Sequence, residues 1–470
     1  MPLQPPEIAN EFPATDAEVE NPVEDERIVP DATQDSNQDP TEMPEQELAE
    51  HDNPEPSPEA PAPELNFNTS LGLAGNFGGG QGGGERGGLI HARSRGRGLG
   101  KPPVPPENVE AAHVWLADHQ NPEGLWSAAG FGDDSRRTGA RKTYNREFVR
   151  PGDPEGDGGW DRSVDVGLTG LALLAFTGDL NTHKQGRYRV NVRRALTWLL
   201  RVQDNQGCFG PREDDHFVYN HAIATMAMAE LYLITEDRLL RPGVARAVDF
   251  ILRAQNPGLG WRYGVRPGNT DSSVTGWMVL TLHTARMAGI EFDASKSFED
   301  AANWFKLVTH DAGGYPRTGY DSPGGNGARL RAATAYDNLP AMDAIHIMSM
   351  LFMHKAVPND PVLRAQAGAI TQELPQWRLE KLDFYYWYYA SLALFQQGGS
   401  AWEKWERPLA QTLLNNQRGF GSERHESPAT LDEHGSWDPI DAWGSAGGRV
   451  YATAINCLTL QVWYRYARMK

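Results

Sequence analysis

Aspartates stand at the starts of several apolar segments of the sequence. Asp165, Asp271, Asp337 and Asp383 each come at, or just before, the first residue of such a segment. If these segments are helices that share one direction, the carboxylates collect at one mouth of the fold, where they can raise one another's pKa and do acid–base chemistry. An aspartate at a helix start also caps free N–H groups and suits the positive end of the helix dipole. Capping is the simpler interpretation, and the acid–base interpretation stays open beside it.

Other polar residues lie near the same helix starts. His221 opens an apolar segment beside Asp214 and Asp215, although a hydrogen-bonded core histidine is the simpler interpretation. The candidates for the mouth are Asp165, His221, Asp271, Asp337, Asp343 and Arg449.

The sequence predicts no metal site and no cofactor. His346 and His354 are eight residues apart on one predicted helix, and no third ligand is spaced with them. Cys208 and Cys457 are too few for a disulfide framework or a cysteine-rich zinc site.

Aromatic residues are densest in the run Tyr385-Tyr-Trp-Tyr-Tyr389. Aromatic rings that line a cavity can stabilise cations. At helical spacing only one or two of the five can face a cavity, and the others must pack between helices. The aromatic candidates for the cavity are Trp277, Tyr385, Tyr388 and Tyr451.

Two kinds of helical segment alternate from about residue 106. One kind carries a charged stripe, and the other is apolar on nearly every side, so the first should surround the second. Six pairs are predicted: 109–120 with 165–177, 190–203 with 221–234, 243–255 with 273–288, 298–309 with 340–354, 362–374 with 384–397, and 402–417 with 449–466. The last segment is too apolar to end an open solenoid. We therefore predict an all-α, six-repeat α/α toroid with an inner and an outer ring of helices.

Short turns with Gln, Gly and an aromatic residue follow the amphipathic segments. They are Gln120…Gly124-Leu-Trp126, Gln203…Gly207-Cys-Phe209, Gln255…Gly260-Trp261, a degenerate His310…Gly314-Tyr315, and Gln417 with Gly435-Ser-Trp437. The series resembles the repeats of squalene cyclases and protein prenyltransferase β subunits. More narrowly, the stretches 165–176, 219–225, 271–277 and 447–451 resemble a bacterial group of squalene-cyclase-repeat proteins. The resemblance implies a terpenoid-cyclase toroid in which these turns are structural braces.

The catalytic motifs of those families are absent from the sequence. The nearest string to the Asp-x-Asp-Asp motif of cyclases is Arg212-Glu-Asp-Asp-His216, no Asp-Asp-x-x-Asp motif occurs, and Ile455 replaces the zinc-binding Asp two residues before Cys457. We therefore expect a toroid that binds a small molecule or protein in its central cleft and is not an enzyme, or, if it is one, is of terpene-cyclase or prenyltransferase type. The alternatives are a divergent enzyme on isoprenoid or lipid substrates, and a carbohydrate-active enzyme that uses the mouth carboxylates, as inverting glycosidases with this fold do.

The ends of the domains follow from composition. Residues 1–70 are predicted to be a disordered acidic tail, since residues 1–66 hold 19 acidic residues, one Arg and 13 prolines. Residues 71–105 are predicted to be a Gly/Arg-rich linker, and residues 106–470 are predicted to form the toroid. The toroid's neutral balance of charges argues against nucleic-acid binding, and no apolar run is long enough to span a membrane. A cytoplasmic location is expected by default, or the cell envelope if an anchor precedes the given start.

Overall fold

The computed structural model describes residues 103–143, 162–213, 216–312, 314–324, 339–420 and 426–466. Contacts divide the chain into Met1–Leu65 and Asn66–Lys470, and every described residue belongs to the second unit. The predicted tail and all of the linker before residue 103 lie outside the described residues.

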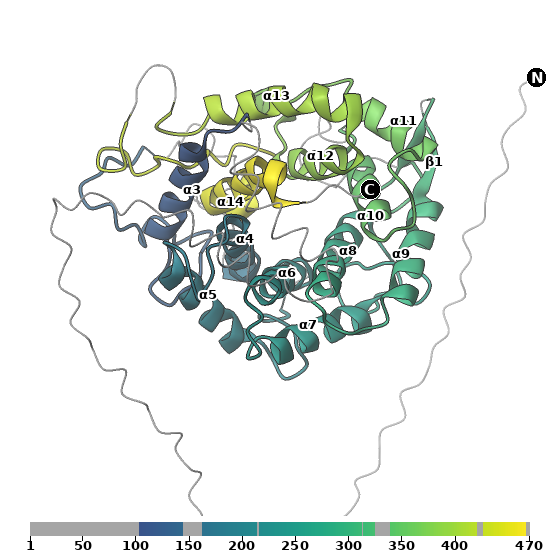
Figure 1. The fold of residues 1–470 in the computed structure, drawn as a ribbon, viewed down its shortest axis with the longest axis horizontal. Coiled ribbons are helices and arrows are strands. Elements are labelled where there is room, and N and C mark those ends of the chain that lie inside the picture. Colours follow the sequence, from purple (N-terminus) through teal and green to yellow (C-terminus); the bar gives the residue numbers. More distant parts are fainter. Residues whose placement is uncertain are drawn as a thin grey trace, which may run out of the picture. The chain divides into compact units, whose positions relative to one another are not determined.

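The inner ring consists of helices that are buried on every side. In the described residues these are α4 (Asp165–Gly178), α6 (Phe217–Thr235), α8 (Ser272–Met287), α10 (Ala341–Phe352), α12 (Phe384–Gln397) and α14 (Gly444–Arg465). Every residue of α4 is buried, as expected for a segment with no polar face. Each inner helix contacts the next one along the chain, and α14 contacts α4, which closes the ring (Figure 1).

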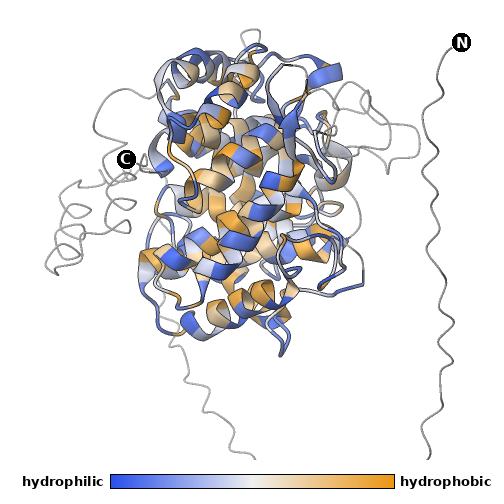
Figure 2. Cartoon of the chain, turned by 90° about the vertical axis from the view of Figure 1, so that its right-hand side faces the viewer, coloured by the Kyte–Doolittle hydropathy of each residue, from blue (hydrophilic) through white to orange (hydrophobic). Residues whose placement is uncertain are grey.

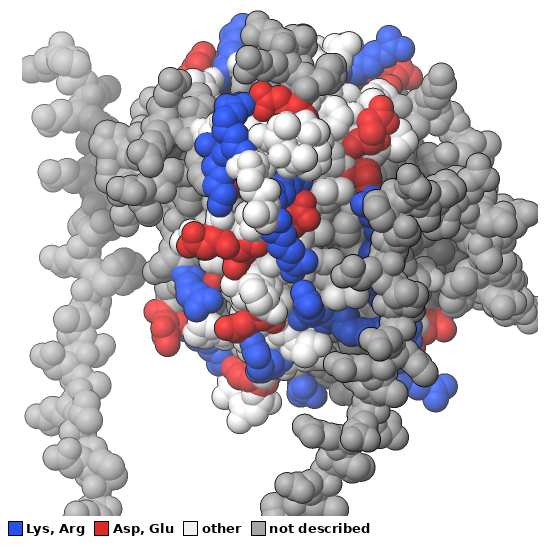
Figure 3. Space-filling model, turned by 90° about the vertical axis from the view of Figure 1, so that its left-hand side faces the viewer, with Lys and Arg blue, Asp and Glu red and all other residues white. Residues whose placement is uncertain are grey.

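The outer ring consists of amphipathic helices that cover the inner ring. They are α3 (Pro106–Asp118), α5 (Arg189–Val202), α7 (Arg241–Ala254), α9 (Ala294–Val308), α11 (Pro361–Ile370) and α13 (Gly399–Asn415). In α5, Val192, Trp198 and Leu199 are buried while Arg193 and Arg194 are exposed. Figure 2 shows hydrophilic and hydrophobic residues mixed along such helices, and Figure 3 shows basic and acidic side chains mingled on one outer face. The predicted all-α toroid is confirmed.

The remaining described elements are short. Two 3-10 helices, η2 (Arg162–Val164) and η4 (Leu379–Lys381), precede α4 and α12. Strands β1 (Thr309–Asp311) and β2 (Pro316–Thr318) form an antiparallel hairpin, with Thr309 opposite Thr318. The hairpin stands where the degenerate turn beginning at His310 was expected to repeat the others. Without a Gln at position 310 the backbone groups there pair with each other instead.

A glutamine amide joins each well-formed turn to the next outer helix. Gln120 Nε2 donates to the carbonyl oxygens of Gly124, at 2.8 Å, and of Asn191 in α5, at 2.9 Å. Gln203 and Gln255 bond to α7 and α9 in the same way. Gly124 has a φ of +107°, and a Cβ there would collide with the backbone carbonyl of Arg194. The turn therefore requires glycine for its conformation and for its close approach to α5.

The same amide closes the ring between its last and first repeats. Gln417 Nε2, after α13, donates to the carbonyl oxygens of Gly435 and of Asn108 in α3, both at 2.8 Å. Its Oε1 accepts a hydrogen bond from Asn108 Nδ2 at 2.6 Å. Because α14 also contacts α3 and α4, the first and last repeats meet at a seam that is built like the other junctions.

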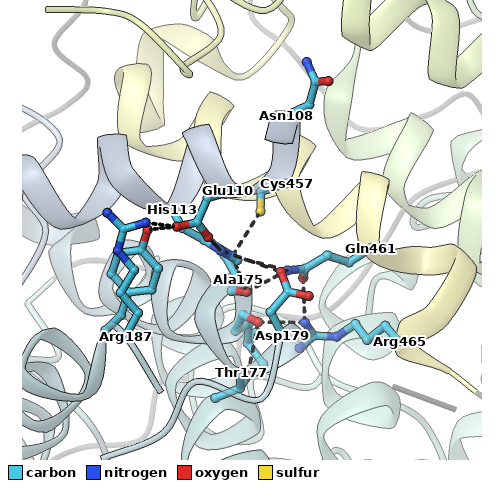
Figure 4. Close-up of polar contacts among 12 residues, drawn as sticks. Asn108, Glu110, His113, Ala175, Thr177, Asp179, Arg187, Cys457, Gln461 and Arg465 are labelled. Carbon is cyan, nitrogen blue, oxygen red and sulfur yellow. Dashed lines mark hydrogen bonds and ion pairs between the residues drawn. The ribbon is translucent and has the colours of Figure 1, made fainter. Parts of the chain in front are cut away.

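Figure 4 shows the buried polar groups of this seam. His113 of α3 lies 2.9 Å from the carbonyl oxygen of Ala175, 3.7 Å from Cys457 Sγ and 3.6 Å from Asp179. Burial alone lowers the pKa of His113, but Cys457, Glu110 and Asp179 together raise it well above its usual value. The imidazole links α3, α4 and α14.

A second buried link runs from α14 to α4 and α6. Arg465 Nη2 contacts both carboxylate oxygens of Glu230, at 2.8 and 2.9 Å, and Nη1 donates to the carbonyl oxygen of Leu174 at 2.6 Å. The Arg465 side chain is 0% exposed and that of Glu230 is 3% exposed.

Among the described helices, none is long and apolar enough to cross a membrane.

We expect Arg465→Met to destabilise the whole toroid by about 3–5 kcal/mol, because it leaves the Glu230 carboxylate buried without its cation. Urea unfolding followed by circular dichroism measures this loss. The control is Arg201→Met, which removes an ion pair with Glu123 in which both side chains are 61% exposed and should change stability by less than about 1 kcal/mol. Equal losses in the two variants would show that the seam does not depend on the buried pair.

Candidate functional site

The starts of the inner helices lie together at one end of the ring, which we call the mouth. Asn220 of α6 accepts a hydrogen bond from Gly167 N of α4 at 3.2 Å. Tyr219 of α6 contacts Ser273 of α8, and Ser273 contacts Tyr385 of α12. The first turns of four inner helices are thus neighbours. The structure therefore brings the starts of these helices together at one end of the ring.

Two of the predicted aspartates brace connecting segments. Asp165, in the first turn of α4, accepts a hydrogen bond from Ala128 N at 3.2 Å and lies 3.6 Å from Arg162. Asp343, in the first turn of α10, accepts hydrogen bonds from Thr318 N at 2.7 Å and from the Tyr315 hydroxyl at 3.0 Å. Burial raises the pKa of each to about 6. Asp337 lies outside the described residues.

His221 and Arg449 are also structural. His221 Nδ1 accepts a hydrogen bond from Phe209 N at 3.1 Å, and its Nε2 lies 3.1 Å from the carbonyl oxygen of Ala247. Burial lowers its pKa to about 4, so it is neutral. It takes the place that a threonine hydroxyl has in other repeats, where Thr169 and Thr275 accept from the turn backbone. Arg449 is fully buried and contacts Asp438 at 2.6 Å.

Of the aromatic candidates, two lie deep in the ring and two lie at the mouth. The Trp277 ring of α8 lies 6.2 Å from that of Tyr388 and 5.6 Å from that of Tyr389, both in α12. Since α10 separates α8 from α12 along the ring, these contacts cross its interior. Tyr388 is 0% exposed, whereas Tyr385 and Tyr451 are 8% and 9% exposed and contact groups at the mouth. Tyr385 and Tyr451 are therefore the candidates that belong to the site.

Asp271 is the buried acid at the start of α8. It caps the helix through Oδ1, which accepts from Val274 N at 2.8 Å. Its Oδ2 is buried and makes no hydrogen bond of ordinary geometry with a described residue. Burial raises the pKa of Asp271 to about 7. Helix capping thus explains the position of Oδ1. It does not explain why Oδ2 is buried or why the pKa of Asp271 is raised.

Asp383 and Asp441 form a second acidic group at the start of α12. Asp383 caps this helix, accepting from Tyr386 N at 2.9 Å, and Asp441 Oδ2 accepts from Phe384 N at 3.1 Å. Burial, and then the neighbouring Asp383 carboxyl, raise the pKa of Asp441 to about 8. Burial raises that of Asp383 to about 6. We call Asp271, Asp383 and Asp441 the mouth acids.

Aromatic rings and hydroxyls surround the mouth acids. The Tyr385 ring lies 5.8 Å from that of Trp443. The carboxyl groups of Asp271 and Asp383 are both close enough to Tyr385 to raise the pKa of its hydroxyl. The Tyr451 hydroxyl lies 3.5 Å from Asp441 Oδ2. Trp443 is half-buried, so its ring offers an apolar surface beside the acids.

Of the residues described at this mouth, the sequence analysis named Asp271, Asp383, Tyr385 and Tyr451 but not Asp441, Trp443 and Ser273. Asp441 lies in the segment between α13 and α14 and not at the start of a helix, so no capping position in the sequence marks it. The alternation of Trp437, Asp441 and Trp443 was the available signal.

The mouth acids are not ligands of a recognisable metal centre. In the described part of the chain, no three His, Cys, Asp or Glu side chains are placed to hold a metal ion. A recess beside α12 is lined by residues that include Leu374, Tyr386 and Trp387. None of the three mouth acids lines it, so we do not place the site there.

No protein-family model and no curated protein matches the sequence. Among solved structures, similar folds are those of the α-1,6-mannanase GH76A of Salegentibacter sp. HEL1_6. An inactive variant with α-1,6-mannotriose has a TM-score of 0.48 at 9% identity, over 76% of this chain and 98% of that one. The enzyme itself gives 0.46 at 8% identity, and an inactive variant with α-1,6-mannotetrose gives 0.47 at 9%, over the same shares of the chains. The likeness is one of fold.

These comparisons correct the family expected from the sequence. The resemblance to squalene cyclases and prenyltransferases is wrong, because the similar structures are those of glycoside hydrolases. The expectation of a noncatalytic binding toroid, or of a terpene-cyclase-like enzyme, is corrected by the same finding. The misleading signal was the Gln–Gly–aromatic turn, which solves a problem of helix packing and carries no information about chemistry.

We expect Asp441→Asn to stabilise the protein at alkaline pH. The folded state keeps a proton on Asp441 up to a pKa of about 8, whereas the unfolded chain loses it near pH 4. Folding stability therefore falls as pH rises between these values, and removal of the charge should restore about 2–5 kcal/mol at pH 9 and almost nothing at pH 4. Thermal melting across this range measures the effect.

The control for this experiment is Asp237→Asn. Its contact with His183, at 2.9 Å, lowers the pKa of Asp237, so its stabilising effect is present above pH 4 and is lost in acid. This variant should be less stable than the wild type at pH 7. If Asp441→Asn were also destabilising at pH 9, the carboxyl would be a structural brace like Asp343.

Proposed function

We propose that the chain is a carbohydrate-active enzyme that cleaves glycosidic bonds with the mouth acids. The observation that carries the proposal is the Asp383–Asp441 pair, in which burial and the Asp383 carboxyl raise the pKa of Asp441 to about 8, together with Asp271 as a buried acid of lower pKa at the same mouth. A protein gains no stability from such a pair, and pKa values set apart in this way are typical of acid–base sites.

The proposed reaction needs one acid and one base. Asp441 donates its proton to the glycosidic oxygen as the bond from that oxygen to the anomeric carbon breaks. Asp271, whose pKa of about 7 leaves it partly ionised at neutral pH, accepts a proton from the water that attacks this carbon. The sugar gains the hydroxyl of that water, the leaving group takes the proton of Asp441, and atoms and charge balance.

The surroundings of the mouth acids suit a sugar better than a lipid. Trp443 and Tyr385 present rings whose faces are apolar and whose edges are polar, which matches a pyranose. Hydroxyls of Ser273, Tyr385 and Tyr451 lie among them. Because Asp271 and Asp441 are at most 1% exposed, substrate binding has to displace the aromatic side chains above them.

The test is hydrolysis of a panel of neutral and uronic polysaccharides. The panel includes α-1,6-mannan, since the structural neighbours are α-1,6-mannanases. We expect the wild type to release reducing ends from at least one polymer. Asp441→Asn and Asp271→Asn should lower kcat by about 10²–10⁴-fold on that substrate. Asn still caps α8, so loss of activity in Asp271→Asn would not come from loss of the helix cap.

The matched control is Asp343→Asn, a buried carboxyl at the same end of the ring whose oxygens brace the β1–β2 hairpin. It should lose stability and keep its activity per folded molecule. Full activity in Asp441→Asn, or no cleavage of any polymer in the panel by folded protein, would contradict the proposal.

A further inference from the structure

Four tyrosines and a serine form a hydrogen-bonded cluster beside Asp271, and we call them the tyrosine cluster. They are Tyr219, Tyr263, Tyr320, Tyr385 and Ser273. The hydroxyls of Tyr263 and Tyr320 are 2.7 Å apart, and those of Ser273 and Tyr385 are 2.6 Å apart. The Tyr219 hydroxyl donates to Ser273 Oγ at 3.1 Å. These residues come from α6, α8, α12 and two connections, so the toroid brings together side chains that are up to 166 positions apart in the sequence.

Two of the three hydrogen bonds of this cluster have no fixed direction. In both close hydroxyl pairs either oxygen can be the donor. Each pair can therefore offer a ligand a donor or an acceptor by rotating its protons. A sugar hydroxyl also donates and accepts, so such pairs match a polyol. A carboxylate or sulfate accepts only, and its recognition normally uses a free cation or several fixed donors.

The described arginine beside the cluster, Arg262, already has partners. Arg262 lies 3.5 Å from Asp321, and its guanidinium carbon lies 5.6 Å from the centre of the Tyr263 ring and 5.7 Å from that of Tyr320. Its charge is thus held by an acid and by two aromatic faces. An anionic ligand would have to displace Asp321 from Arg262, and it would also bring a second negative charge close to Asp271.

The cluster also meets solvent with its aromatic surface. Tyr219 and Tyr263 are half-buried, and their ring centres are 5.9 Å apart. Two partly exposed rings beside directionless hydroxyl pairs give an apolar surface with polar edges, which is the arrangement that a pyranose ring requires.

We propose that the tyrosine cluster is a subsite for a neutral sugar unit and that it excludes uronic acids and sulfated sugars. The inference rests on the proposed function for its place beside Asp271, and it narrows the substrate to neutral glycans. Tyr263, Tyr320 and Tyr385 then act in specificity and binding, while the mouth acids act in bond cleavage.

The test is binding to full-length Asp441→Asn protein, in which cleavage is suppressed. Isothermal titration calorimetry is done with mannotetraose, cellotetraose, maltotetraose and, as the anionic probe, tetragalacturonate. We expect at least one neutral tetrasaccharide to bind at least 10-fold more tightly than tetragalacturonate. Tyr263→Phe and Tyr385→Phe should each raise the Kd of that sugar by about 5–10-fold, as loss of one hydrogen bond to a ligand does.

The control is Tyr188→Phe, which removes a tyrosine hydroxyl bonded to Glu110 on the outer helices, 2.7 Å away. It should leave the Kd unchanged. Melting curves for each variant show whether it is folded, and Tyr385→Phe can be replaced by Tyr320→Phe if it is not. Tetragalacturonate binding as tightly as the neutral sugars, or no binding of any neutral probe, would overturn the inference.

The outcomes separate this inference from the proposed function. If neutral sugars bind and the tyrosine variants weaken binding, but wild-type protein cleaves nothing, the subsite stands and the enzymatic proposal fails. If the wild type cleaves only uronic polymers, the enzymatic proposal stands and the neutral subsite fails.

Discussion

The toroid depends on a side-chain amide that ties four of its turns to the neighbouring outer helix. A buried junction between two helices leaves backbone carbonyls without donors, and water cannot reach them. The Gln120, Gln203, Gln255 and Gln417 amides each supply two donated bonds at such a junction. Because Gln417 makes its second bond to α3, the interaction that adds one repeat to the next also ends the series by closing the ring.

The mouth has the opposite energetic character. At the turns the glutamine amides supply donors to buried backbone carbonyls. At the starts of α8 and α12, in contrast, carboxyl groups are buried with pKa values raised to between about 6 and about 8. These groups cost stability at neutral pH, and the strong closure of the ring offsets that cost. A rigid ring that satisfies its own junctions can hold an unfavourable arrangement of acids in place, which is the usual relation between a scaffold and an acid–base site.

The fold was predictable because it follows from periodicity. Amphipathic helices need one face in solvent, and helices that are apolar on every side need to be buried. Two concentric layers meet both needs, and the predicted pairs match the structure to within a few residues at most ends. The site was not predictable to the same degree. Asp165, Asp271 and Asp343 look alike in sequence. The structure separates them by their contacts: both oxygens of Asp343 accept hydrogen bonds, Oδ2 of Asp165 lies 3.6 Å from Arg162, and Oδ2 of Asp271 has neither kind of contact with a described residue. Asp441 occupies no capping position in the sequence, and its place at the start of α12 follows only from its contact with Phe384 N in three dimensions.

The seam between α3 and α14 has a consequence for how the ring relates to the order of the chain. Since this junction is built like those after Gln120, Gln203 and Gln255, none of these four junctions is a preferred point at which the polypeptide must begin. A circular permutant that joins the two helices by a linker and opens the chain at a different turn would keep the same set of junctions. Related rings opened at different turns would then share geometry while their repeats stand in rotated order, and an alignment that follows the chain would pair only part of each ring.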